Sequence, residues 1–165
     1  MNANRRLGFI TAFTLFAADQ ILKYIIIGPL ALETVGNIPL LPIFDFTWTQ
    51  NYGVALGMFK AGSETARWVL VAVTAGIAGF VIHWLWRETN RSDVVGLGLI
   101  LGGALGNILD RVRFGYVVDF LDLHFGTFRP FLIFNLADAA ITVGVLILLA
   151  RAFLVREPKP EAETE

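Results

Sequence analysis

The chain has 165 residues, 56% of them hydrophobic, and its formal net charge is -1. Soluble domains contain roughly 45–50% apolar residues, so this composition favours an integral membrane protein. The near-neutral charge excludes the basic footprint of a nucleic-acid-binding protein. The chain has no cysteine, only two serines in polar stretches (Ser63 and Ser92), and no H-E-x-x-H motif. This inventory argues against hydrolysis by Ser, Cys or zinc.

Four segments are apolar enough to cross a bilayer core of about 30 Å, which takes about 20 helical residues. We expect transmembrane helices at about residues 7–27, 68–86, 94–112 and 131–153. We expect the first to be an uncleaved span rather than a cleaved signal peptide, because Asp19, Gln20 and Lys23 lie in its outer half and no small-residue cleavage site follows. The sequence therefore predicts an all-α polytopic membrane protein with one membrane-embedded domain, residues 1–156.

The first long loop carries a strand signal, in an outer β region of about residues 36–60. Apolar Phe44, Phe46 and Trp48 alternate with polar residues, and Asn51-Tyr52-Gly53 follows as a turn. We expect a small apolar-faced sheet region lying on the outer leaflet, with Trp48 and Tyr52 at the interface. The second outer loop, about residues 113–130, contains Asp119, Asp122 and His124 among Phe and Leu.

Lysine and arginine set the expected orientation, since they are enriched in cytoplasmic loops. With the N-terminus inside, the cytoplasmic side holds Arg5, Arg6, Arg87, Arg91, Arg151, Arg156 and Lys159. The outer side then holds fewer: Lys60, Arg67, Arg113 and Arg129. We therefore expect both termini to be cytoplasmic, with residues 157–165 forming a disordered cytoplasmic tail because of their prolines and glutamates.

Ionisable and amide residues in the spans share helix faces at spacings of three or four residues. They are Asp19 with Lys23, Asn107 with Asp110 and Arg111, and Asn135 with Asp138. Each group alone has a structural explanation: an ion pair, an interface anchor, interhelical hydrogen bonds or a helix-dipole partner. Together they lie at one membrane level on the outer side, and intramembrane ionisable groups usually face a functional interior. The glycine repeat Gly98, Gly102 and Gly106 is architectural, a stripe for close helix packing.

With hydrolysis by Ser, Cys or zinc disfavoured, carboxylates are the side chains left that could catalyse hydrolysis. Two carboxyls that share one proton can activate a water and polarise a scissile carbonyl without Ser, Cys or metal. The residues alone leave five candidates open: Asp19, Asp110, Asp119, Asp122 and Asp138. Two alternatives also stand: a metal site at His124 with Asp119 and Asp122, and a transporter with a proton relay through Asp19, Asp110 and Asp138.

Five ordered blocks of the sequence resemble signal peptidase II, the lipoprotein signal peptidase family of aspartic endopeptidases in the bacterial inner membrane. The blocks are Asp19-Gln20-x-x-Lys23, Asn51-x-Gly53-x-Ala55, Gly102-Gly103-Ala104-x-Gly106-Asn107-x-x-Asp110-Arg111, Val118-Asp119-Phe120 and Phe134-Asn135-x-Ala137-Asp138. Two positions depart from the family pattern. Pro130-Phe131-Leu132-Ile133 stands where family members often have Trp, and Ala139 stands where Ser is frequent.

The resemblance implies that Asp119 and Asp138 are the catalytic pair. It implies that the residues lining or supporting the site are Asp19, Lys23, Asn51, Gly53, Asn107, Asp110, Arg111 and Asn135. The implied substrate is a diacylglyceryl-modified prolipoprotein cut just before the lipidated cysteine, with no metal or other cofactor. The implied setting is the inner membrane, with the site near the outer leaflet, membrane lipid as a partner and a monomeric enzyme. A catalytically dead homologue that only binds is a third alternative, which the intact aspartate pair disfavours.

Overall fold

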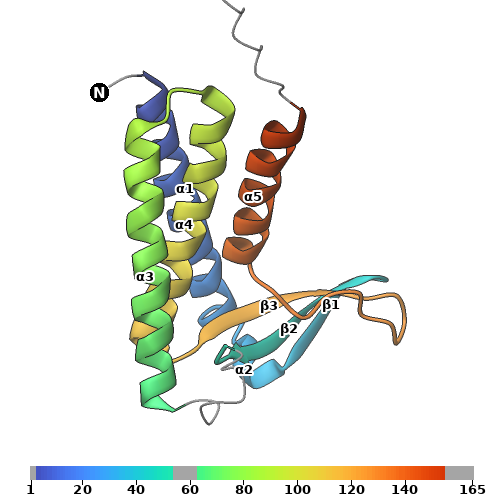
Figure 1. Cartoon of the computed structure of the whole chain (residues 1–165). Helices are drawn as coiled ribbons and strands as arrows, with labels where there is room; N and C mark the ends of the chain where they lie inside the picture. The colour runs from blue at the N-terminus through green and yellow to red at the C-terminus, as the bar shows by residue number, and fades with distance from the viewer. Residues whose placement is uncertain (1–2, 54–62, 155–165) are drawn as a thin grey trace, which may run out of the picture.

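The fold is a bundle of four long helices with a small sheet at one end (Figure 1). It is taken from a computed structural model that describes residues 3–53 and 63–154. In that part of the chain the elements are α1 (Ala3–Ile27), α2 (Leu32–Val35), β1 (Asn37–Leu41), β2 (Phe44–Asn51), α3 (Glu64–Arg87), α4 (Arg91–Phe114), β3 (Val117–Leu123) and α5 (Leu136–Leu154). Among the described residues, α1, α3, α4 and α5 are the helices long and apolar enough to span a membrane.

Helix α4 is the centre of the bundle and packs against α1, α3 and α5. Its glycines allow close approach to α1. A Cβ atom at Gly98 would lie 2.5 Å from the Gly8 carbonyl oxygen, and one at Gly102 would lie 2.5 Å from the Ala12 carbonyl oxygen. On the α5 side, a Cβ atom at Gly103 would lie 2.5 Å from the Ala137 carbonyl oxygen. The predicted packing role of the glycine stripe is confirmed, because only residues without a side chain fit at these crossings.

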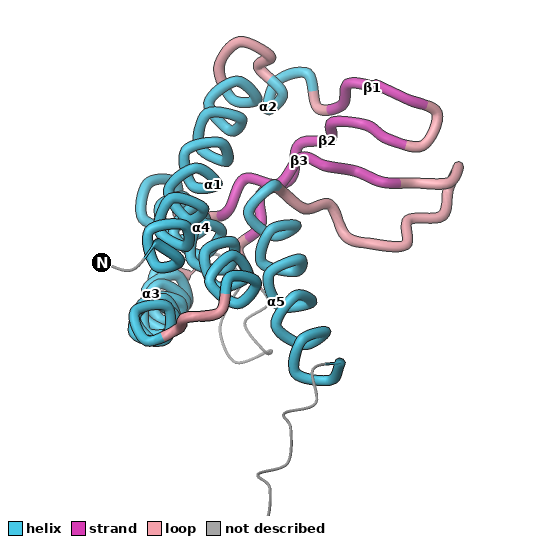
Figure 2. The backbone as a smooth tube through the Cα atoms, turned by 90° about the horizontal axis from the view of Figure 1, so that it is seen from above, coloured by secondary structure: helices cyan, strands magenta, loops and turns pink. Residues whose placement is uncertain are grey.

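The three strands form one antiparallel sheet in the order β1-β2-β3. Figure 2 shows that the sheet projects to one side of the helix bundle and that β3 is the strand next to the helices. Phe46, Trp48 and Phe120 of its apolar face pack with Ile26 of α1 and Leu32 of α2. The protein's own helices therefore cover part of this face. The opposite face of the sheet is polar, and the candidate active site lies on that side.

The second outer loop contains a strand that we did not expect, β3, which carries Asp119. The fourth long helix also begins at Leu136 rather than at about residue 131. Phe134 instead pairs with Leu121 of β3, and the preceding Pro130 lacks a backbone donor. The apolar run from residue 131 therefore reads as a span in sequence but folds partly as an extended connection. The last part of the predicted β region and the predicted disordered tail lie outside the described residues.

Candidate active site

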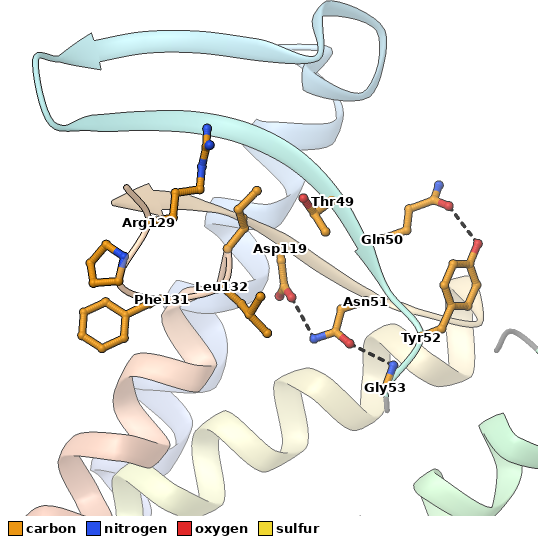
Figure 3. A pocket seen from close by; sticks show the side chains of 11 residues that line it. Thr49, Gln50, Asn51, Tyr52, Gly53, Asp119, Arg129, Phe131 and Leu132 are labelled. Atoms are coloured by element: carbon orange, nitrogen blue, oxygen red, sulfur yellow. Dashed lines mark hydrogen bonds between the residues drawn. The ribbon is translucent and has the colours of Figure 1, made fainter. Parts of the chain in front are cut away.

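Asp119 lies in the middle of β3, on the sheet face turned toward the start of α5. Two amides hold its carboxylate: Asn51 Nδ2 donates to Oδ2 at 2.9 Å and Asn135 Nδ2 donates to Oδ1 at 2.6 Å. Asn51 is the last residue of β2, beside β3, and Figure 3 shows its side chain turned toward Asp119. Asp119 is only 1% exposed, so its carboxylate depends on these two donors.

Asp138 lies in the first turn of α5, in a reciprocal cap with Asn135. The backbone N–H of Asp138 donates to Asn135 Oδ1 at 2.9 Å, and the backbone N–H of Asn135 donates to Asp138 Oδ2 at 3.4 Å. This arrangement is a capping box, and it places the carboxylate at the positive end of the helix dipole. From α4, Asn107 Nδ2 donates to Asp138 Oδ1 at 2.8 Å.

Asn135 connects the two carboxyls, because its side-chain amide contacts Asp119 and its backbone N–H contacts Asp138. Its amide orientation is determined, since Oδ1 accepts from the α5 backbone and Nδ2 donates to Asp119. Asn107 is oriented in the same way: its Oδ1 accepts from Asn135 at 3.3 Å and from Lys23 at 3.4 Å. Its Nδ2 is thereby directed to Asp138. Residues from α1, α4, β2, β3 and α5 thus converge on one pair of aspartates.

The electrostatics of Asp119 suit acid–base chemistry. Burial, and then the neighbouring charge of Asp138, raise the pKa of the Asp119 carboxyl from 3.8 to about 6. The hydrogen bonds from Asn51 and Asn135 lower this pKa, but burial outweighs them. A carboxyl with a pKa near neutrality, coupled to a second carboxyl, can both hold and release a proton at physiological pH.

Asp19, Lys23 and Asp110 form a separate buried cluster behind the pair. Lys23 Nζ lies 2.9 Å from Asp19 Oδ2 and 2.7 Å from Asp110 Oδ2, and all three side chains are buried. Asp19 also accepts from the backbone N–H of Ala137 at 3.1 Å, and Asp110 accepts from the backbone N–H of Val118 at 3.2 Å. The cluster therefore holds the start of α5 and the start of β3 in place. Because its carboxylates are occupied in this way, it does not favour the proton relay.

Gln20, which the helical spacing did not single out, also forms part of this cluster. Its Nε2 donates to Asp19 Oδ2 and to Asp110 Oδ1, at 3.1 Å in both cases. The only sequence signal was its position beside Asp19 in the first block. Gly106 lies against the cluster as well, since a Cβ atom there would lie 2.5 Å from Asp19 Oδ2. The glycine stripe and the polar residues are therefore linked in space.

Gly53 follows the end of β2 and lies near the side chain of Arg111, which is in the last turn of α4. The Gly53 N–H donates to Asn51 Oδ1 at 2.8 Å, and Gly53 adopts a positive φ of 79°, which favours glycine. This contact orients the Asn51 amide so that its Nδ2 reaches Asp119. A Cβ atom at Gly53 would lie 3.8 Å from Arg111 Nη2, and the Arg111 guanidinium interacts electrostatically with Asp138 and Asp119. Arg67 of α3 donates to the Arg111 carbonyl oxygen at 2.7 Å, a support that sequence analysis missed.

Asp122 and His124 do not join the pair. Asp122 accepts from Arg129 Nε at 2.9 Å and from Thr47 at 3.0 Å, and the Arg129 hydrogen bonds lower the pKa of its carboxyl. His124 Nε2 lies 3.3 Å from Asp45. The contacts of Asp122 and His124 are thus made within the sheet and the loop that follows it. Among residues 3–53 and 63–154, no three metal-ligating side chains come together.

Two grooves lead to the carboxyls. The larger, about 710 Å³, is bounded by the end of β2 and the connection before α5, and Asp119 lines it (Figure 3). The smaller, about 360 Å³, runs along α5 and contains Asp138 with Phe134, Ala139, Thr142 and Val143. The first groove therefore combines polar residues of β2 with apolar residues of the connection before α5, and the second is almost wholly apolar.

Comparison with known proteins gives a consistent result. The family model described as "Signal peptidase (SPase) II" matches residues 11–154. A lipoprotein signal peptidase of Rhizorhabdus wittichii is 57% identical over 97% of this chain and 93% of its own length, and one of Sphingopyxis alaskensis is 54% identical over 97% and 92%. A bacterial membrane enzyme solved by the in meso method superposes with a TM-score of 0.76 at 28% identity, covering 96% of this chain and 94% of that one. The chain therefore belongs to the signal peptidase II family of peptidases.

Proposed function

We propose that this protein removes the signal peptide from diacylglyceryl-modified prolipoproteins, with Asp119 and Asp138 as its two catalytic carboxylates. The single observation that carries the proposal is the convergence of both carboxyls on Asn135. The names of the close relatives and the raised pKa of Asp119 support the same assignment. The cleaved bond is the one just before the lipidated cysteine.

The chemistry begins with one proton held by the pair. Asp119, the carboxyl with the raised pKa, donates this proton to the scissile carbonyl oxygen. Asp138 takes a proton from a water as the water oxygen attacks the carbonyl carbon, which forms a neutral tetrahedral diol. The diol then returns one hydroxyl proton to Asp119 and the proton on Asp138 passes to the amide nitrogen. The carbon–nitrogen bond breaks and leaves a carboxyl on the signal peptide and an amine on the cysteine.

The supporting residues have distinct roles in this proposal. Asn51, Asn107 and Asn135 orient the two carboxyls through the hydrogen bonds described above. Arg111 offsets part of the negative charge of the pair, with which it interacts electrostatically. Asp19, Lys23 and Asp110 fix the elements that carry the pair, and Gly53 sets the Asn51 amide.

Substitution of each carboxyl tests the assignment. Asp119→Asn and Asp138→Asn should each abolish cleavage of a lipidated precursor, because neither amide can exchange a proton in this way. Asp93→Asn is the matched control: Asp93 pairs with Arg151 at the other end of the bundle and should leave cleavage intact. Precursor processing at the normal rate by either of the first two variants would exclude the pair.

We further propose a monomer in the bacterial inner membrane, with both termini cytoplasmic and the sheet, together with the pair, at the outer leaflet in contact with lipid. The chain has no cysteine, so single introduced cysteines report topology cleanly. Thr127→Cys, after β3, should react with an impermeant maleimide in intact spheroplasts. Thr89→Cys, between α3 and α4, should react only after permeabilisation. The reverse pattern would overturn the orientation, and a dimer mass in detergent by light scattering would overturn the monomer.

A further inference from the structure

A separate pocket lies between α1 and α4, which both end at the sheet end of the bundle (Figure 1). Its volume is about 190 Å³, far more than a single water needs. The side chains that matter for its chemistry are Gln20, Lys23 and Tyr24 of α1 and Arg113 and Phe114 of the last turn of α4. No residue that lines this pocket also lines either groove, so the pocket is not part of the candidate active site.

Arg113 gives this pocket a cation that the described part of the chain does not neutralise. The side chain is exposed, and its guanidinium carbon lies 4.9 Å from the centroid of the Phe114 ring. Within residues 3–53 and 63–154 no carboxylate forms an ion pair with it. A guanidinium at the end of a membrane span reaches the depth of the lipid headgroups, where phosphate is the abundant anion.

Tyr24 adds a hydroxyl to the same pocket. The residue is 72% exposed, and among the described residues its hydroxyl has no hydrogen-bond partner. Tyrosine is enriched at membrane interfaces, because its ring suits the apolar side and its hydroxyl suits the headgroups. Ile27 and Phe114 supply apolar walls. Polar donors above apolar walls are what a bound lipid headgroup requires.

The buried end of the pocket is formed by Gln20 and Lys23, which belong to the cluster with Asp19 and Asp110. The Lys23 ammonium already contacts both carboxylates. Gln20 Nε2 donates to the same two carboxylates, and no described residue donates to Gln20 Oε1. Together with Arg113, the surroundings of the pocket contain two cations and two carboxylates and so carry no net formal charge. A ligand with both a phosphate and an ammonium therefore suits them better than one with a net negative charge.

We propose that this pocket binds the headgroup of a zwitterionic phospholipid with a primary ammonium, of the phosphatidylethanolamine class, from the leaflet at the sheet end. The lipid phosphate accepts hydrogen bonds from the Arg113 guanidinium and the Tyr24 hydroxyl, and the ammonium donates to Gln20 Oε1. Gln20 is bonded to the cluster that holds the starts of α5 and β3, so the bound lipid stabilises the folded protein. The inference does not depend on the proposed reaction.

Thermal unfolding in detergent micelles tests the site, with dioleoyl lipids added at increasing mole fraction. Phosphatidylethanolamine should raise the melting temperature of wild type to a plateau, because a ligand that binds only the folded state stabilises it by mass action. Diacylglycerol lacks the phosphate and phosphatidylcholine lacks an N–H donor, so neither should produce this saturable rise. Phosphatidylglycerol, which has a net negative charge, should require a higher mole fraction than phosphatidylethanolamine.

Variants locate the effect. Arg113→Gln should raise the mole fraction at half-saturation about tenfold or more, since the hydrogen bond from a charged group to the phosphate is lost. Tyr24→Phe removes a neutral donor and should raise it by a smaller factor, about threefold. Arg87→Gln is the matched control: Arg87 is an exposed arginine in the last turn of α3, at the other end of the bundle, and its loss should leave the response unchanged.

Several results would overturn the proposal. If wild type shows no saturable rise with phosphatidylethanolamine, or if Arg113→Gln keeps the wild-type midpoint, the pocket does not bind this lipid. An equal loss in Arg87→Gln would show that the response follows the total charge of the protein rather than this pocket. An equal response to phosphatidylcholine, phosphatidylglycerol or diacylglycerol would exclude recognition of a headgroup with a phosphate and a primary ammonium. The readout is folding stability, so each of these results leaves the peptidase assignment standing.

Discussion

Replacing Asp119 with asparagine should stabilise the protein at alkaline pH while it abolishes activity. The pKa of this carboxyl is about 6 in the folded protein, against an ordinary value of 3.8. At about 1.4 kcal/mol per pH unit, ionising the buried group destabilises the fold by about 3 kcal/mol above pH 6. Asparagine removes that penalty but presents an amino group to one of the two donors, Asn51 or Asn135, and loses about 1 kcal/mol. The net gain is about 2 kcal/mol.

The direction of this pKa shift determines the pH dependence that a stability assay should show. Because the folded pKa is raised, the contribution of Asp119 to wild-type stability falls as the pH rises from about 4 to 6 and levels off above that. The melting temperature of Asp119→Asn in detergent should exceed that of wild type by roughly 4–8 °C at pH 8, since 1 kcal/mol shifts Tm by roughly 2–4 °C in a domain of this size. The advantage should disappear near pH 4, where wild-type Asp119 is protonated. A variant less stable than wild type at pH 8, or a gain independent of pH, would refute the reasoning.

Asp122 provides the opposite case on the same strand. Hydrogen bonds from Arg129 lower the pKa of its carboxyl, so its stabilising contribution is present above the usual pKa and is lost as the pH falls through the lowered value. Asp122→Asn should therefore melt at a lower temperature than wild type at pH 8, and the difference should narrow in acid. A pH dependence of the same sign as that of Asp119→Asn would show that the effect does not come from these carboxyls.

Three further predictions concern the pair and its support. The kcat/KM of the wild type should decline as pH rises above about 6, because the pair loses the proton that Asp119 holds; a profile flat from pH 5 to 8 would contradict this. Lys23→Met should destabilise the protein by about 3–5 kcal/mol, since it leaves buried carboxylates without their cation, and an unchanged Tm would exclude that role. Gly106→Ala should lower stability by about 1–3 kcal/mol through overpacking against Asp19, whereas Gly76→Ala, with open space around it, should not; equal effects would contradict the close packing.

The primary sequence was sufficient to predict the helical membrane fold. Runs of apolar residues set the number of spans, because a helix is the local way to satisfy backbone groups in a bilayer. The glycine stripe predicted a close helix contact for a similar local reason. The predicted start of the fourth helix was wrong, because an apolar run after Pro130 has the same sequence pattern whether it forms a helix or pairs with a strand. The pairing of Phe134 with Leu121 depends on residues distant in sequence.

For the candidate site, too, the sequence determined some features and the tertiary structure decided others. Residue types and helical spacing favoured carboxylate chemistry but left five aspartates open, and only resemblance to a family reduced them to two. The tertiary structure shows why their environments differ. Lys23 forms ion pairs with both Asp19 and Asp110, and Arg129 pairs with Asp122. Asp119 and Asp138 instead meet amide donors, chiefly Asn135. Spacing along a chain fixes which side chains share a helix face, whereas the partner of each charge, and with it the pKa, depends on which elements pack together.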